Sequence, residues 1–257
     1  MYGEEVNKVA ETSIKKAEFL KLKKGKVGYL LLAMLAGLYV GLGIMLIYTI
    51  GGYLSAANSP ATKIVMGVSF GVALSLVIMA GSELFTGNSF VMMIGYLKKS
   101  TSIKDGLKIL LFSYLGNLMG SIIGAFAFYS AGLAKGSIGE FIVHTSEVKM
   151  SLPVHELFVR GVLCNILVCL ATWFTYKLKE ETAKLIMIFW CLFTFITAGF
   201  EHSIANMTLF SIALFIPHGD IVSLGGAIYN LGFVTLGNFI GGAIILAVPY
   251  YIVSKEK

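Results

Sequence analysis

Six long apolar stretches dominate the pattern of hydrophobic and polar positions along this chain. Each is at least as long as the roughly 20 residues that a helix needs to cross a hydrocarbon core of about 30 Å. They predict six membrane-spanning helices, at residues 27–57, 64–97, 106–133, 153–176, 185–217 and 224–253. An even number of spans places both chain ends on the same side. The expected fold class is therefore an all-α polytopic membrane protein.

The segment before the first stretch has a different pattern. Residues 1–26 contain seven lysines, and their apolar residues recur at helical spacing, at Val6, Ala10, Ile14, Ala17 and Leu20. This pattern predicts a cytoplasmic amphipathic helix that lies at the membrane surface, separate from a six-helix domain at 27–257. Its lysines are typical of a solvated, lipid-facing surface. Whether the helix also acts as a gate is left open by the pattern.

Composition and charge placement narrow the class of protein further. Of all residues 57% are hydrophobic and 13% are charged, whereas soluble domains carry about 25% charged residues, so a soluble enzyme is excluded. Sixteen of the 20 basic residues lie in the N-terminal segment, the 98–108 and 177–184 connections and the C-terminus, which includes Lys257. Only Lys63, Lys135, Lys149 and Arg160 lie on the other side. This asymmetry predicts cytoplasmic termini and explains the net charge of +6 without a nucleic-acid partner.

Polar residues interrupt the second and fifth stretches. Residues 81–88 and 199–206 share the pattern Gly-x-Glu-x-x-x-x-Asn at an offset of 118, and Leu-Gly-Asn-x-x-Gly recurs at 115–120 and 236–241. These matches predict a duplication, with repeats at about 27–133 and 153–253. Three spans per repeat place the two repeats in opposite orientations. Because a broken helix is tolerated in a membrane only where protein or a cavity satisfies its backbone, the paired breaks predict a transport site near the midplane.

The interruptions also carry the candidate chemistry. Glu83 and Glu201 are intramembrane carboxylates, expected either to cap the half-helices or to couple protons. His202 has no counterpart in the first repeat, and its imidazole changes charge near neutral pH. The Thr86 hydroxyl and the Asn165 amide are candidate hydrogen-bond donors to an anion, or contacts that hold helices together.

Two other classes of function fit the sequence less well. A pore for neutral solutes would need two Asn-Pro-Ala half-helix starts, but residues 58–61 (Asn-Ser-Pro-Ala) are the nearest match and lie in a connection. An intramembrane protease would use Ser69 and His202, but the Gly-x-Ser-x-Gly pattern at 67–71 lies within a helix-like run. No metal-ligand spacing is present, so neither enzyme activity nor a cofactor is expected.

Four segments resemble motifs of the formate/nitrite transporter family. They are 84–88 (Leu-Phe-Thr-Gly-Asn), 161–165 (Gly-Val-Leu-Cys-Asn), 201–207 (Glu-His-Ser-Ile-Ala-Asn-Met) and 234–242 (Val-Thr-Leu-Gly-Asn-Phe-Ile-Gly-Gly). The resemblance implies a homopentamer of aquaporin-like protomers in a bacterial inner membrane, surrounded by lipid. Each protomer would have its own pore for small monovalent anions.

The resemblance also favours a particular anion. Within the family the chain looks most similar to its hydrosulfide channel, and Gly-Asn follows Thr86 where formate channels tend to have Ser-Thr. Hydrosulfide is therefore the expected substrate, with formate and nitrite as further candidates. The alternative is a proton-coupled secondary transporter of the same weak-acid anions.

The same resemblance implies which residues line the pathway. The family's central histidine falls on His202, accompanied by Thr86, Asn165, Glu201 and a vestibule lysine at Lys149. An inner hydrophobic constriction is expected at Leu74, Leu84 and Phe195, and an outer one at Phe70, Phe85 and Val168.

Overall fold

All six predicted spans form helices in the computed structural model, which describes residues 2–255. Lys257, counted above among the basic residues, lies outside the described residues. Helices long and apolar enough to cross a membrane occupy Gly25–Ala56, Thr62–Met79, Ile103–Ser130, Val154–Lys177, Glu181–Ala198 and Leu224–Ser254. Residues 2–255 contain no β-strand. The all-α membrane fold class is confirmed.

Several spans consist of more than one helical element. In chain order the elements are α1 (Gly3–Lys21), α2 (Gly25–Ala56), α3 (Thr62–Ser69), α4 (Gly71–Met79), α5 (Phe85–Leu97), α6 (Ile103–Ser130), α7 (Gly136–Met150), α8 (Val154–Lys177), α9 (Glu181–Ala198), α10 (Ser203–Phe215), α11 (Leu224–Phe239), the π-helix η1 (Ile240–Leu246) and α12 (Ala247–Ser254).

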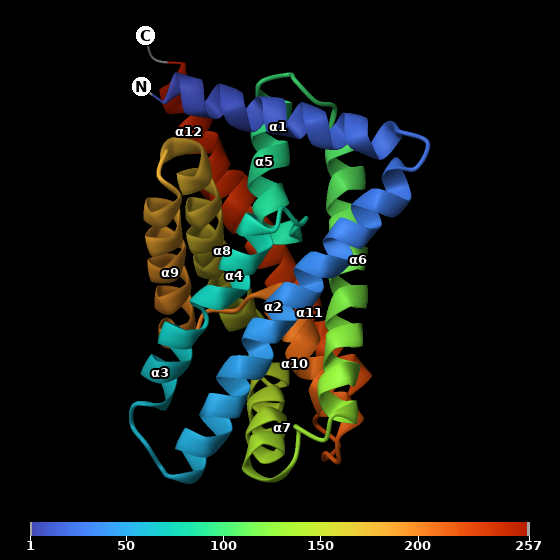
Figure 1. Ribbon diagram of the computed structural model, residues 1–257, viewed down its shortest axis with the longest axis vertical. Helices are drawn as coiled ribbons and strands as arrows, with labels where there is room; N and C mark the ends of the chain where they lie inside the picture. The colour runs from blue at the N-terminus through green and yellow to red at the C-terminus, as the bar shows by residue number, and fades with distance from the viewer. Residues whose placement is uncertain (1, 256–257) are drawn as a thin grey trace.

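The two ends of the bundle differ in what covers them. Both described chain ends lie at the top of Figure 1, where α1 runs across the bundle and the α5–α6 and α8–α9 connections also lie. We call this the terminal end. Helix α7 and the α2–α3 connection lie at the opposite end. The basic connections therefore share one end of the molecule with both termini.

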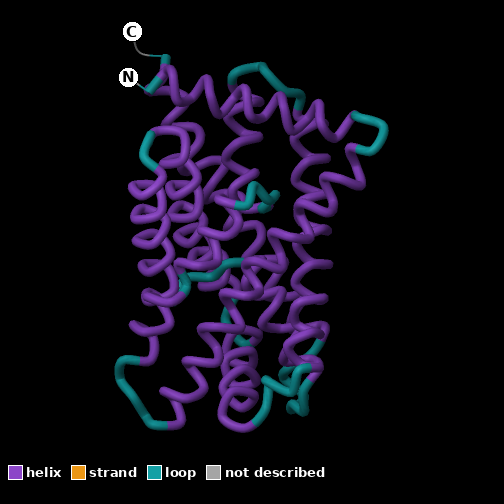
Figure 2. The backbone as a smooth tube through the Cα atoms, in the orientation of Figure 1, coloured by secondary structure: helices purple, strands orange, loops and turns teal. Residues whose placement is uncertain are grey.

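The two broken spans have matching local geometry. Loop backbone separates α4 from α5 and α9 from α10, visible as teal segments at mid-height in Figure 2. Gly81 and Gly199 have φ angles of 70° and 77°, in the left-handed region that glycine adopts without a Cβ clash. This conformation explains the glycine of the repeated motif. The breaks are shorter than predicted, because Asn88 and Asn206 lie within the first turns of α5 and α10.

Close helix packing joins the first and third spans of each repeat. A Cβ at Gly120 of α6 would lie 1.9 Å from the carbonyl oxygen of Met34 in α2, and one at Gly241 of η1 would lie 2.3 Å from that of Val162 in α8. Only glycine permits these approaches. The glycines of the second repeated motif are therefore packing residues, as small residues commonly are in membrane helices.

Helix α7 was not predicted, because residues 136–150 are short and mixed in polarity. It precedes α8 as α1 precedes α2, so in each half of the chain a shorter helix is followed by a span, a broken span and a third span. Helix α1 buries an apolar face that includes Val6, Val9 and Leu20. Its position at the membrane surface, and the division of the chain at residue 26, stay predictions.

Candidate functional site

A buried asparagine holds the break before α10. The Asn238 side-chain oxygen accepts a hydrogen bond from the Ser203 N–H at 2.9 Å. Its amide nitrogen donates to the carbonyl oxygens of Glu201, at 2.9 Å, and Gly161, at 2.8 Å. One side chain therefore satisfies three backbone groups, two of which belong to the break itself. A break inside a membrane requires such hydrogen-bond partners for its freed backbone groups.

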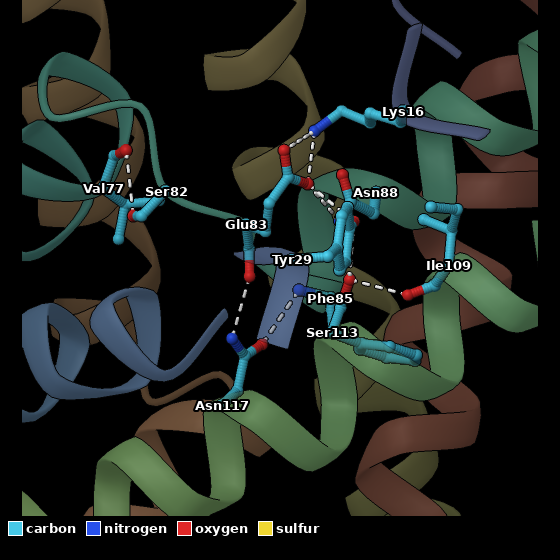
Figure 3. Close-up of polar contacts among 10 residues, drawn as sticks. All are labelled: Lys16, Tyr29, Val77, Ser82, Glu83, Phe85, Asn88, Ile109, Ser113 and Asn117. Carbon is cyan, nitrogen blue, oxygen red and sulfur yellow. Dashed lines mark hydrogen bonds and ion pairs between the residues drawn. The ribbon is translucent and has the colours of Figure 1, made fainter. Parts of the chain in front are cut away.

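Asn117 holds the break before α5 in the same way. Its oxygen accepts from the Phe85 N–H at 3.0 Å, and its nitrogen donates to the Glu83 carbonyl oxygen at 2.9 Å (Figure 3) and to that of Ala33 at 2.8 Å. We call Asn117 and Asn238 the clamp asparagines. The sequence analysis used both only as evidence of duplication, and their position in the repeated Leu-Gly-Asn motif was the available signal.

The Glu83 carboxylate lies at the centre of a polar cluster (Figure 3). It is ion-paired with Lys16 of α1 and accepts hydrogen bonds from the Tyr29 hydroxyl, at 2.7 Å, and the Asn88 amide, at 3.0 Å. Ser113 completes the cluster through bonds to Tyr29 and Asn88. Helix α1 is thereby attached to the break by a lysine that the sequence analysis had assigned to solvent.

Glu201 makes the corresponding contacts in the second repeat. It is ion-paired with Lys149 of α7 at 2.6 Å and accepts from the Asn206 amide at 2.6 Å. Asn206 also donates to Asn230 at 2.9 Å. Neither glutamate side chain accepts a hydrogen bond from the backbone N–H groups of its half-helix. The predicted capping of the half-helices by these carboxylates is therefore not found. The clamp asparagines supply that function instead.

His202 is the N-cap residue of α10. Its Nδ1 accepts a hydrogen bond from the Ala205 N–H at 3.1 Å, which places the proton of a neutral ring on Nε2. Nε2 lies 3.1 Å from the hydroxyl oxygen of the buried Thr86. The ring therefore donates to Thr86, whose own hydroxyl hydrogen remains free to donate onward. At the other break the N-cap residue is Leu84, which forms no side-chain cap.

An apolar cavity of about 10 Å³ adjoins His202. Its lining includes five of the six predicted constriction residues, namely Phe70, Leu74, Leu84, Val168 and Phe195. The volume is about that needed for one water molecule. The rings of Phe195 and His202 stack with centroids 5.9 Å apart. Residues of the predicted inner and outer sets therefore line one small cavity.

Phe85 and Asn165 are placed differently from the other predicted residues. Phe85 is not part of this lining, and its ring packs edge-on against Tyr114 at 5.3 Å. The Asn165 amide nitrogen donates to the Asn238 carbonyl oxygen at 2.6 Å and to that of Thr86 at 3.2 Å. Because its donor group is committed to α5 and α11, Asn165 holds helices together in this structure.

A larger cavity of about 370 Å³ leads from the opposite end to the second break. It reaches Phe200 and Glu201, and Lys63, Lys149 and Arg160 contribute cationic side chains to its lining. We call it the vestibule. Lys149 was predicted here, whereas Lys63 and Arg160 were known only as basic residues on this side. Among residues 2–255 no three His, Cys, Asp or Glu side chains are grouped as a metal site would require.

Comparisons with known proteins place this geometry in context. The sequence model described as formate/nitrite transporter matches residues 3–252. The chain is 41% identical to the nitrite transporter NirC of Escherichia coli strain K12, over 100% of this chain and 94% of NirC. A solved FNT family ion channel superposes with a TM-score of 0.90 at 39% identity, covering 97% of this chain and 98% of that one. A pentameric formate channel with formate bound gives 0.79 at 29% identity, over 92% and 100%.

Proposed function

The chain belongs to the formate/nitrite transporter family, and from this premise we propose that it is a channel for small monovalent anions, with hydrosulfide as the preferred one and formate and nitrite also carried. The family consists of transporters and channels, not enzymes. The observation that carries the proposal is the His202–Thr86 donor pair beside a small apolar cavity, which we take as the narrow passage of the pore.

The contacts support a route in three steps. Anions collect in the cationic vestibule, where Lys149 is held by Glu201 next to the break. They then shed water at the apolar passage, a step that costs more for larger and multivalent ions. His202 and Thr86 replace part of the lost hydration with N–H and O–H donors. The neutral donors bind an anion without the strong trapping that a permanent buried cation would produce.

Two features favour hydrosulfide over formate. Hydrosulfide has a single heavy atom, which suits a passage with room for about one water molecule. Formate and nitrite each have three heavy atoms and require the passage to widen. The Gly87-Asn88 pair after Thr86 also departs from the Ser-Thr that formate channels tend to have.

The proposed assembly is a homopentamer in the bacterial inner membrane, with one pore in each protomer. It is supported by the similarity to the pentameric formate channel and by the six apolar spans. The basic excess at the terminal end supports cytoplasmic termini. In this orientation α1 lies at the inner membrane surface and the vestibule opens outward.

Flux measurements in proteoliposomes test the proposal. Uptake of hydrosulfide, formate and nitrite should exceed that into empty liposomes, with hydrosulfide fastest. His202→Ala should slow all three. A channel reading fails if none of the anions enters, and the hydrosulfide preference fails if formate or nitrite is faster. Unchanged uptake in His202→Ala removes His202 from the mechanism.

A proton-coupled transporter remains the alternative mechanism for the same anions. It would use His202 and Glu201 as a relay, but the Glu201 carboxylate is occupied by Lys149 and Asn206. An imposed pH gradient separates the two mechanisms. Accumulation of anion against its own gradient supports coupling, whereas flux that follows only the anion's electrochemical gradient supports a channel.

A further inference from the structure

The three cations of the vestibule differ in whether a carboxylate neutralises them. Lys149 is paired with Glu201 at 2.6 Å, and Arg160 is paired with Glu156 one helical turn away. Lys63 forms no ion pair with any residue between 2 and 255. The uncompensated positive charge of the vestibule therefore belongs to Lys63.

Neither helix stability nor topology accounts for a lysine at this position. Lys63 is the second residue of α3, where the helix dipole disfavours a cation. It also lies at the lysine-poor opposite end of the molecule, where positive charge does not help to set orientation. Its side chain is exposed and lines the same cavity as Glu201. The positive end of α3 adds to the potential that Lys63 creates at the vestibule.

We propose that Lys63 is the residue that captures anions from the outer solution, while the charge of Lys149 is used to hold Glu201 at the break. This inference rests on the proposed anion-channel function and separates capture from passage within it. An exposed charge acts through a long-range field, so its effect is largest at low ionic strength and low anion concentration.

The test compares ionic strengths in proteoliposomes, with nitrite as the probe because it is almost fully ionised at neutral pH. Lys63→Gln should lower uptake from dilute nitrite about threefold at roughly 10 mM ionic strength, as expected for one charge several ångströms away through water. At about 1 M salt the Debye length is about 3 Å, and the difference should vanish. Uptake at saturating nitrite should match the parent protein.

Lys135→Gln is the matched control. It removes a lysine from the same end of the molecule, but Lys135 lines a different cavity beside the start of α7. Its uptake should equal that of the parent at both ionic strengths. Lys149→Gln should behave in a third way, because it leaves Glu201 uncompensated at the break. Its loss of uptake should persist at about 1 M salt.

Restoring the charge separates the field of Lys63 from any structural effect. The native cysteines are all buried, so a membrane-impermeant thiol reagent added to both sides should modify Lys63→Cys selectively. A cationic reagent should restore uptake from dilute nitrite, and an anionic reagent should lower it further. The parent treated in parallel should not respond.

The outcomes are distinguishable. If Lys63→Gln matches the parent at low ionic strength, or if its loss persists at about 1 M salt, the inference is overturned while the channel function stands. If the parent passes no anion, the proposed function fails and the inference fails with it.

Discussion

The two helix breaks share the same backbone support and differ in the residue that follows the glutamate. In each, a glycine with positive φ precedes a glutamate, and a clamp asparagine bonds the first helical N–H and the glutamate carbonyl. Even the glutamate N–H groups match, bonding the carbonyl oxygens of Leu32 and Arg160 at 3.2 Å. The next residue is Leu84 in one break and His202 in the other.

This difference separates the residues that support the two breaks from the residue that is special to one of them. The features common to both breaks provide hydrogen bonds for the freed backbone groups and pair the glutamates with lysines. Any broken membrane helix must have partners for its backbone groups. The histidine is found in only one break, where it lies beside Thr86 and the small apolar cavity. The four predictions below test whether the residues common to both breaks stabilise the fold while His202, found in one break, acts on the anion.

The largest effect is expected at the clamp asparagines. Asn117→Ala or Asn238→Ala leaves one N–H and two carbonyl groups without a partner in a buried site, which should cost about 4 kcal/mol of stability. Both variants should show a much lower thermal midpoint in detergent. Asn7→Ala, at an exposed position on α1, is the control and should change little. A large loss at only one clamp would contradict the equivalence of the breaks.

The paired carboxylates should differ in degree. Glu201→Gln leaves Lys149 uncompensated and should cost about 3 kcal/mol. Glu83→Gln should cost less, about 2 kcal/mol, because the Glu83 side chain is 12% exposed and that of Glu201 only 3%. Thermal unfolding measures both. The double variant Glu201→Gln/Lys149→Met should recover much of the loss, and no recovery would show that the ion pair is not the cause.

His202→Leu gives the second break the leucine that follows the glutamate in the first. Loss of a donor to a charged ligand, worth about 2 kcal/mol, should reduce anion flux about 30-fold. His202→Asn retains an N-cap side chain and an amide donor, so it should keep stability near the parent and lose less flux. Equal flux in His202→Leu and the parent would mean that the asymmetry has no role in passage.

The smallest effect is expected at the tyrosine that supports Glu83. Tyr29→Phe removes the hydroxyl bonded to Glu83 and should cost about 1 kcal/mol. Tyr48→Phe is the control, because Tyr48 is also buried but its hydroxyl bonds to no residue between 2 and 255. Similar thermal shifts in the two variants would contradict a specific role for the Tyr29 hydroxyl.

The sequence predicted the spans and the breaks because their signals are local. Hydrophobic length identified the six spans, and the repeated Gly-x-Glu motif located both interruptions. The same local reasoning missed α7, whose 15 residues are too short and too polar to stand out. It also extended each break to Asn88 and Asn206, because polar residues inside a helix resemble loop residues in sequence.

Reasoning from local sequence patterns could not identify hydrogen-bond and ion-pair partners that lie far apart in the chain. The sequence by itself determined an all-helical membrane bundle with two inverted halves, since burial in lipid depends on residue type and spacing. Only the tertiary structure assigned Lys16 to Glu83, 67 residues away, and gave backbone groups of both breaks to Asn117 and Asn238. It also showed that, among residues 2–255, Lys63 is the vestibule cation without a carboxylate partner. Hydrogen bonds and ion pairs act over a few ångströms of space, and a chain pattern does not specify which distant groups come that close.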